Sequence, residues 1–462
     1  MLARCSLGGH TSSAVRQQCR QPLHRRGLAA AASGTFQYQT GEAAGVKIAT
    51  RDLPGPTTHL ALVAKAGTRY QLMPGLAEGL EKFAYKGTSK RSALRIARET
   101  ELLGSEVSSY HSRESLVLSA KFLREDLPYF VELLSEVTSK TKFSRHEFVE
   151  EVLPTIKLAQ KSMLANTTEF AINSAHGIAF HRGLGTPLHP SSSSPLTKYL
   201  SERAIAAYAS AVYSKPNMAI VANGANQEEL SRWVGEFFAD ASSSWPADVP
   251  KVESTPSKYH GGEERIAHDG GNTMVIAFPG SSSYTAGASY KPEVAVIAAL
   301  LGGQTSIKWS PGFSLLSKAA SSFPGANATT THLPYSDAGL LYIAITGSAN
   351  AVRGASENAV KALKSLAAGE ISNEDLKKAT ATAKFQALET GQKVDTGLEL
   401  TGAGLIQKGQ AFQLDEVAKG IDTVSTDQIK KTAKTMLEGK ATVSTVGDLY
   451  VLPFAEELGL KV

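Results

Sequence analysis

The sequence predicts an α+β protein made of two homologous α/β halves related by internal duplication. Three observations predict this fold class. The chain has 462 residues, which is more than one hydrophobic core usually holds. Short strands alternate with longer helices along its whole length. The order of these elements repeats with a period of about 220 residues.

The composition is that of a globular protein, because 42% of the residues are hydrophobic and 20% are charged. The net charge of +5 comes from the first 28 residues, which contain five arginines, no lysine and no acid, so the remainder is neutral. A neutral body gives no electrostatic argument for binding nucleic acid. No uncharged apolar run approaches the ~18–20 residues of a membrane helix, so any membrane association is expected to be peripheral or through partners.

Residues 1–34 have the composition of a mitochondrial transit peptide. The segment is rich in arginine and serine, and the first acidic residue of the chain is Glu42. An arginine pair precedes GLAAAAS and indicates cleavage between about residues 26 and 34. The alternative is a disordered basic tail. Both cysteines, Cys5 and Cys19, lie in this segment, so the mature chain would have no thiolate for zinc, an Fe–S cluster or c-type haem.

Each half is predicted to contain the same elements in the same order: a strand pair, a short apolar helix, a long helix with a capping box and a closing strand. In the N-terminal domain, residues 35–240, these elements fall within 45–69, 74–86, 142–160 and 214–224. In the C-terminal domain, residues 263–462, they fall within 263–283, 291–301, 370–386 and 438–448. The capping boxes pair Ser144 with Glu147 and Ser372 with Asp375. The alternative is a chance resemblance between two mixed segments.

The stretch 241–262 is rich in serine and proline and lacks periodic apolar residues, so it is predicted to link the two domains. A second loop, GTPLHPSSSSPL at 185–196, is predicted to be an exposed excursion within the first half. In each half the helices are expected to cover one face of a sheet.

The sequence contains no G-x-S-x-G nucleophile elbow and no G-x-x-x-x-G-K-[ST] phosphate loop. The glycines of LLGGQTS at 300–306 are predicted to form a helix C-cap and turn. His176 and His181 are five residues apart and are predicted to be helix-end or loop residues. His111 and Glu114 are predicted to lie on opposite faces of one strand, in structural or surface roles.

The most informative stretch is PGLAEGLEKFAYKGT at 74–88, in which Glu78, Glu81 and Lys82 share one face of a predicted helix. A further stretch, SALRIARETELLGSEVSSYHSRESLVLSA at 92–120, contains a Ser-Arg-Glu step. In both stretches the chain resembles the inverted-zincin, or pitrilysin-type, metallopeptidases, and in particular their mitochondrial processing peptidase branch. The resemblance extends over residues 36–462.

This resemblance implies that the zinc motif of active members, H-x-x-E-H, is degenerate here. The first ligand histidine falls on Glu78, the catalytic glutamate on Glu81 and the second ligand histidine on Lys82. The third ligand of active members is a glutamate, and its window at 157–159 contains no acid. We expect no catalytic residue, metal ligand or cofactor, because a protonated lysine cannot bind a metal. Glu78 and Lys82 are expected to form an i,i+4 ion pair in the former metal space.

The fold that the resemblance implies is a clam-like arrangement of two pitrilysin-type domains. The non-catalytic subunit of the processing peptidase has a multi-glycine substrate loop, whereas ALLGGQTSIKWSPGFSLLSKA at 299–319 interrupts that tract. The stretch THLPYSDAGLLYIAITG at 331–347 is most similar to the core-2 branch of the family, which is built into ubiquinol–cytochrome c reductase, respiratory complex III.

The core-2 branch implies a non-catalytic structural subunit that supports assembly and stability of the complex on the matrix side of the mitochondrial inner membrane. The implied partners are core subunit 1, in a heterodimer, together with cytochrome b and cytochrome c1 in a dimeric complex. Neither a cofactor of its own nor nucleic acid is expected. The alternative is the non-catalytic, substrate-binding subunit of the mitochondrial processing peptidase. The lost ligands disfavour an independent active metallopeptidase.

Overall fold

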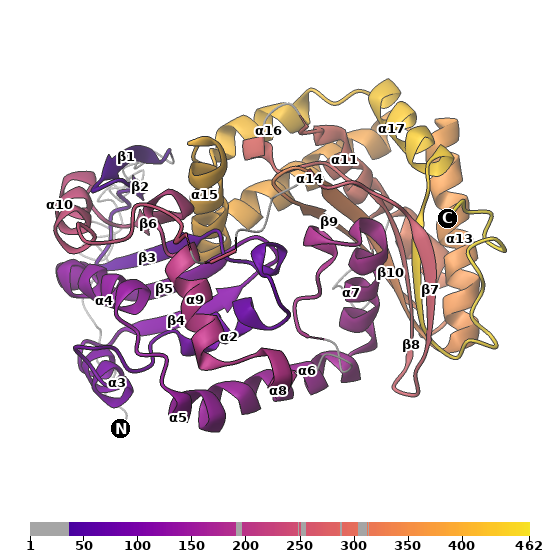
Figure 1. The fold of residues 1–462 in the computed structure, drawn as a ribbon. Helices are drawn as coiled ribbons and strands as arrows, with labels where there is room; N and C mark the ends of the chain where they lie inside the picture. The colour runs from indigo at the N-terminus through magenta and orange to yellow at the C-terminus, as the bar shows by residue number, and fades with distance from the viewer. Residues whose placement is uncertain are drawn as a thin grey trace, which may run out of the picture.

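The computed structural model describes residues 37–190, 196–247, 249–250, 256–286, 289–303, 312 and 314–462. The predicted transit peptide lies outside these residues. Two sheets stand side by side, each with its own helices (Figure 1). The first sheet contains β1 (Gln39–Ala43), β2 (Val46–Arg51), β3 (Thr57–Ala64), β4 (Glu106–His111), β5 (Leu116–Leu123) and β6 (Met218–Asn223). The second contains β7 (Gly262–Ala267), β8 (Asn272–Pro279), β9 (Asn327–Pro334), β10 (Gly339–Gly347) and β11 (Thr442–Gly447).

The two sheets share one topology. The order β2-β6-β3-β5-β4 in the first corresponds strand by strand to β7-β11-β8-β10-β9 in the second, and β1 is an additional edge strand. In each sheet the opening and closing strands of the half pair in parallel, β2 with β6 and β7 with β11. The other corresponding pairs are antiparallel. This correspondence confirms the predicted internal duplication.

The helices of the first half are α2 (Leu76–Phe83), α3 (Ala93–Leu102), α4 (Leu127–Ser139), α5 (Arg145–Glu147), α6 (Leu153–Ala165), α7 (Thr167–Phe180), α8 (Leu196–Tyr199), α9 (Glu202–Val212) and α10 (Gln227–Phe237). Those of the second half are α11 (Pro292–Leu301), α12 (Leu315–Ser321), α13 (Ala349–Ala368), α14 (Asn373–Gln392), α15 (Val394–Lys408), α16 (Leu414–Asp422) and α17 (Thr426–Glu438). No helix in the described part of the chain combines the length and apolar character that a membrane span requires.

The predicted helix starts are present in both halves. Ser144 Oγ accepts a hydrogen bond from the backbone N of Glu147 at 3.3 Å, and Ser372 Oγ accepts one from the backbone N of Asp375 at 3.0 Å. The helix predicted at 142–160 is not continuous, because a π-helical segment, η3 (Phe148–Val152), separates α5 from α6. The predicted C-cap after α11 is confirmed at Gly302, whose φ is +60°.

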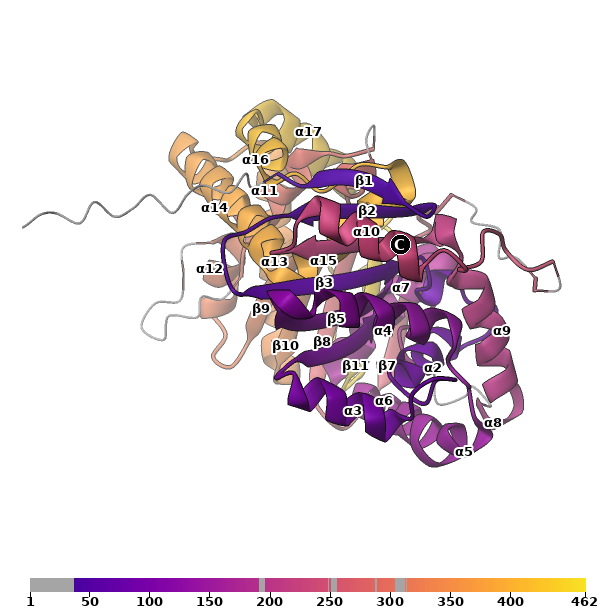
Figure 2. The ribbon, with the colours of Figure 1, turned by 90° about the vertical axis from the view of Figure 1, so that its left-hand side faces the viewer.

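The halves exchange one helix each. Helix α7 of the first half packs on β7, β8 and β11, and α15 of the second half packs on β2, β3 and β6. The first contact buries alanines of α7 against alternate residues of the second sheet, and the second buries leucines of α15 against the first sheet. The first half's own helices α4 and α10 lie on the opposite face of its sheet, toward the viewer in Figure 2. The expectation that helices cover one face was therefore incomplete, since each second face is covered by the other half.

Candidate functional site

Glu78, Glu81 and Lys82, the positions predicted to be a degenerate zinc motif, lie on α2, which begins after Gly75 in a left-handed conformation with φ +88°. The apolar side of α2 packs into the core of the first half and so fixes the direction of its polar side chains. The side chain of Glu78 is fully buried, that of Glu81 is 9% exposed and that of Lys82 is 31% exposed. Two of the three groups are therefore carboxyls that need partners inside the protein.

Glu81 has two partners. Lys82 Nζ lies 2.5 Å from Oε1, and Nδ1 of His111 at the end of β4 hydrogen-bonds to Oε2. Burial acts to raise the pKa of Glu81, but the hydrogen bonds and charges of His111 and Lys82 outweigh it and lower the pKa. Glu81 is thus held as a carboxylate whose two oxygens are both engaged.

The prediction of an ion pair between Glu78 and Lys82 is wrong. Glu78 points inward, and its Oε1 lies 3.0 Å from Nδ1 of His189, which is 111 residues away in the chain. Its other oxygen, Oε2, has no hydrogen-bond partner among the described residues. Lys82 is the most exposed member of the set and reaches the neighbouring Glu81 instead. The hydrogen bond that His189 makes to the Glu78 carboxylate raises the pKa of His189 despite the opposing effect of burial.

The predicted placement of His111 and Glu114 on one strand is also wrong. His111 ends β4, and a turn that includes a 2.7 Å hydrogen bond from Ser112 N to Ser115 O separates it from β5. The two side chains have different partners, Glu81 for His111 and Arg69 for Glu114. His111 hydrogen-bonds to Glu81 with only 4% of its side chain exposed, so of the two predicted roles, structural or surface, the surface role is excluded. Its position beside α2 follows from the sheet topology, which its local sequence does not reveal.

The loop predicted at 185–196 is not an exposed excursion over its described part. Residues 185–190 are buried or half-buried, and residues 191–195 lie outside the described part. Leu188 O lies 3.1 Å from Nε2 of His111, and Gln160 Nε2 on α6 donates to Pro190 O at 3.0 Å. This stretch therefore contacts β4 and α6, and through His189 also α2.

The window expected for the third ligand, residues 157–159, lies on α6. Lys157 and Leu158 are exposed, so these side chains point away from α2, and Gln160 is the residue of this turn that contacts the loop. Among the residues that the structure describes, no three His, Cys, Asp or Glu side chains are placed to hold a metal ion.

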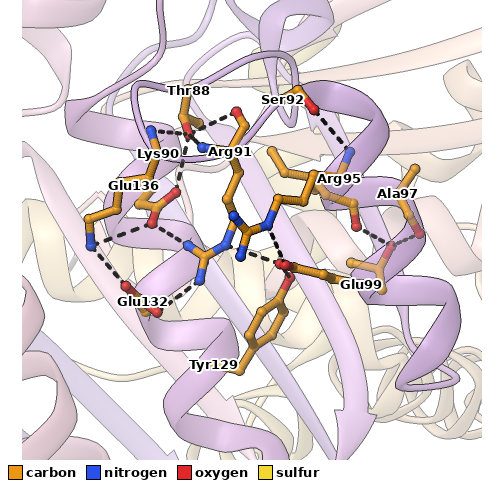
Figure 3. Close-up of polar contacts among 12 residues, drawn as sticks. Thr88, Lys90, Arg91, Ser92, Arg95, Ala97, Glu99, Tyr129, Glu132 and Glu136 are labelled. Atoms are coloured by element: carbon orange, nitrogen blue, oxygen red, sulfur yellow. Dashed lines mark hydrogen bonds and ion pairs between the residues drawn. The ribbon is translucent and has the colours of Figure 1, made fainter.

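A half-buried ion cluster fixes the chain segment that follows α2 (Figure 3). Arg91 Nε donates to Glu99 Oε2 at 3.1 Å and Arg91 Nη2 donates to Glu132 Oε2 at 3.0 Å, while Nη1 donates to Glu136. Thr88 Oγ1 donates to the same Glu136 at 3.2 Å. Because every carboxylate here has a cationic or hydroxyl donor, we interpret the cluster as a structural brace between α3 and α4.

The Ser-Arg-Glu step contacts the second half. Glu114 Oε1 accepts from Arg69 Nη1 at 2.7 Å, and its Oε2 accepts from the backbone N of Ser336 at 2.8 Å. The stretch 331–347, which carried the resemblance to the core-2 branch, thus meets the other signature stretch at the boundary between the halves. The prediction for His176 is wrong, because this residue lies inside α7, fully buried, with Nε2 2.8 Å from Tyr335 Oη.

Two family models match the chain. The model described as insulinase (peptidase family M16) matches residues 47–189, and the model described as peptidase M16 inactive domain matches residues 199–382. Together they cover more than half of the chain. The chain belongs to the M16 peptidase family. Within this M16 chain, α2 with Glu78, Glu81 and Lys82 falls in the first match, and the second match includes most of the C-terminal half.

Several curated proteins are similar to this M16 chain over most of its length. Cytochrome b-c1 complex subunit 2, mitochondrial, of Neurospora crassa is 49% identical, with 100% of both chains covered. The protein of the same name in Cryptococcus neoformans is 36% identical over 91% of this chain and 94% of that one. The probable mitochondrial-processing peptidase subunit alpha-1 of Arabidopsis thaliana is 24% identical over 90% of this chain and 83% of that one. The predicted resemblance to the core-2 branch is confirmed.

Proposed function

We propose that this chain is the non-catalytic, structural core subunit 2 of ubiquinol–cytochrome c reductase and that it supports assembly and stability of the complex. The observation that carries the proposal is the 49% identity over the full length of both chains to a protein named cytochrome b-c1 complex subunit 2. The alternative, a substrate-binding subunit of the processing peptidase, has the weaker support of a relative 24% identical.

The proposal includes no peptidase activity. Glu78, Glu81 and Lys82 are proposed to be relics of a zinc motif that bind no metal, because Glu81 is engaged by Lys82 and His111 and Glu78 is engaged by His189. A lone carboxylate without a metal to polarise the scissile carbonyl has no mechanism for peptide hydrolysis. Titration with zinc in a calorimeter is expected to give no stoichiometric binding. Tight binding accompanied by peptide cleavage would reject this part of the proposal.

The proposed partners are core subunit 1, in a heterodimer, and through the complex cytochrome b and cytochrome c1. The proposed location is peripheral, on the matrix side of the mitochondrial inner membrane, in a dimeric complex. Residues 1–34 are proposed to be a transit peptide, and 35–240 and 263–462 two domains joined by a linker at 241–262. Mass spectrometry of the N-terminus of the mature chain tests the first boundary, and limited proteolysis tests the linker.

Fractionation of mitochondria tests the main proposal. After extraction with a mild detergent, this chain is expected to migrate with cytochrome b haem at constant stoichiometry on a native gel. A soluble matrix enzyme is the control, since it should migrate independently of haem. Recovery of the chain as a haem-free matrix heterodimer would instead support the processing-peptidase alternative.

A further inference from the structure

We propose that the segment Thr186–Pro190 is a built-in occupant of the former catalytic cleft. It contacts α2, which carries the zinc-motif positions, and also β4 and α6, so it fills space beside Glu81 that a bound peptide substrate would need. The loss of activity would then have two independent causes, altered ligands and an occupied cleft. This inference does not depend on which complex the chain joins.

The contacts of the segment with the cleft are polar and specific. His111 is held on both sides, with Nδ1 bonded to Glu81 and Nε2 3.1 Å from Leu188 O. His189 Nδ1 lies 3.0 Å from the buried Glu78. Pro190 O accepts from Gln160 Nε2 at 3.0 Å. The segment thereby comes within one side chain of the only retained catalytic position, and each of its last three residues has a partner in a different element.

The residues at the start of the segment, and those just before it, are also held in place. The buried guanidinium of Arg113 donates to Leu184 O at 3.2 Å and to Thr186 O at 2.5 Å, and its other nitrogen donates to Asn173 at 2.7 Å. A Cβ on Gly185 would lie 3.1 Å from His176 O, so the backbone here packs directly on α7. A mobile surface loop has few such contacts. Arg113, the arginine of the Ser-Arg-Glu step, therefore holds the start of the occupying segment in place.

The chain is also anchored at Leu196 and Leu200. Both leucines are buried and lie beside Gly75, the residue before α2, and Pro190 lies next to the same glycine. A Cβ on Gly75 would be 3.3 Å from Pro190 and 3.4 Å from Leu196. The N-terminus of α2 is thus packed by the last residue of the occupying segment, Pro190, and by Leu196 and Leu200, which follow it in the chain.

Reaction with diethyl pyrocarbonate tests the proposal, because this reagent modifies free imidazole nitrogens and the sites can be mapped by mass spectrometry. In the native full-length chain His111, with both nitrogens engaged, is expected to react at least about tenfold more slowly than His146, whose side chain is 73% exposed. Gln160→Ala combined with His189→Ala removes two anchors and is expected to raise the rate at His111 at least about fivefold. A second variant replaces Leu188–Pro190 with three glycines and is expected to do the same.

The matched control combines Gln392→Ala with His260→Ala, two substitutions of the same kind outside the cleft, and should leave His111 unchanged. His146 serves as the internal reference in every sample. The proposal is overturned if His111 in the native chain reacts as fast as His146, or if its rate is unchanged in both variants while unfolding curves show that they are folded.

Discussion

Arg69 and Asp337 form a two-pronged ion pair between the halves, with Nη1–Oδ1 and Nη2–Oδ2 distances of 2.7 Å each. The two residues are 268 positions apart in the sequence, and the arginine side chain is 5% exposed. The same guanidinium bonds to Glu114 at 2.7 Å. One cation therefore compensates two carboxylates, one from each half of the molecule.

Replacing Arg69 with an uncharged residue should destabilise the folded chain. Arg69→Met leaves Glu114 and Asp337 close together without their shared partner, and we expect the free energy of unfolding to fall by about 3 kcal/mol. Urea unfolding measures the change. The control is Arg353→Met, which breaks a half-exposed pair with Glu457 and should cost less than ~1 kcal/mol. Equal losses in the two variants would contradict a special role for Arg69.

The contact of α15 with the first sheet can be tested at Gly402. A Cβ added there would lie 2.4 Å from Val63 on β3, so Gly402→Ala should destabilise the fold by about 1–3 kcal/mol. Adding Val63→Ala should recover part of the loss. Gly177→Ala on α7 is the matched control, because its nearest neighbour would be 3.7 Å away and alanine favours a helix by up to ~1 kcal/mol. Thermal unfolding that ranks the two alanine variants in the reverse order would refute this packing argument.

The raised pKa of Glu399, at the boundary between the halves, predicts that the stability of the fold depends on pH. Glu399 lies on α15, accepts from Ser112 Oγ at 2.8 Å, and has its pKa raised by burial and by the charge of Glu114, against the opposing hydrogen bonds. The folded chain thus binds this proton more tightly than the unfolded chain. Stability should therefore fall as the pH rises from the ordinary glutamate pKa through the raised value.

Glu399→Gln removes this titration. The variant should melt at a higher temperature than the wild type at pH 8, and the difference should shrink toward pH 4, where both folded and unfolded states hold the proton. Melting curves at several pH values measure the effect. A variant whose difference from wild type is the same at every pH would show that Glu399 does not titrate in this window.

The raised pKa of His189 predicts a second pH dependence of stability, which comes from a cation that is lost at high pH and not from an acid that becomes charged. The hydrogen bond of His189 with Glu78 raises its pKa, burial opposes this, and the charges of Glu78, Glu81 and Glu169 add to the raising effect. The ring of His111 lies 5.9 Å from the ring of His189, centroid to centroid. The stabilisation is therefore fully present below the ordinary histidine pKa and is lost as the pH rises through the raised value. His189→Ala should cost about 1 kcal/mol at pH 6 and much less at pH 9, measured by urea unfolding. His146→Ala, on an exposed helix, should show no such difference.

The order of elements could be predicted because strand and helix patterns are local. The alternation in β3 and the apolar spacing of α2 can be seen in windows of a few residues. The site contacts could not be predicted in this way. Glu78 meets His189 only because the sheet topology returns the loop after α7 to α2, and the i,i+4 rule that suggested Lys82 describes exposed helix faces, whereas Glu78 is buried. In the same way, the apolar faces of α7 and α15 show that they pack, without showing on which sheet.

The exchange of α7 and α15 means that neither half is complete by itself. A fragment ending in the linker would lack the helix that covers its sheet and would carry an unpaired apolar helix, so it should aggregate when produced alone. Two fragments produced together should instead reassemble and stay associated without a peptide bond between them. The chain is, in this respect, a domain-swapped dimer contained in a single polypeptide.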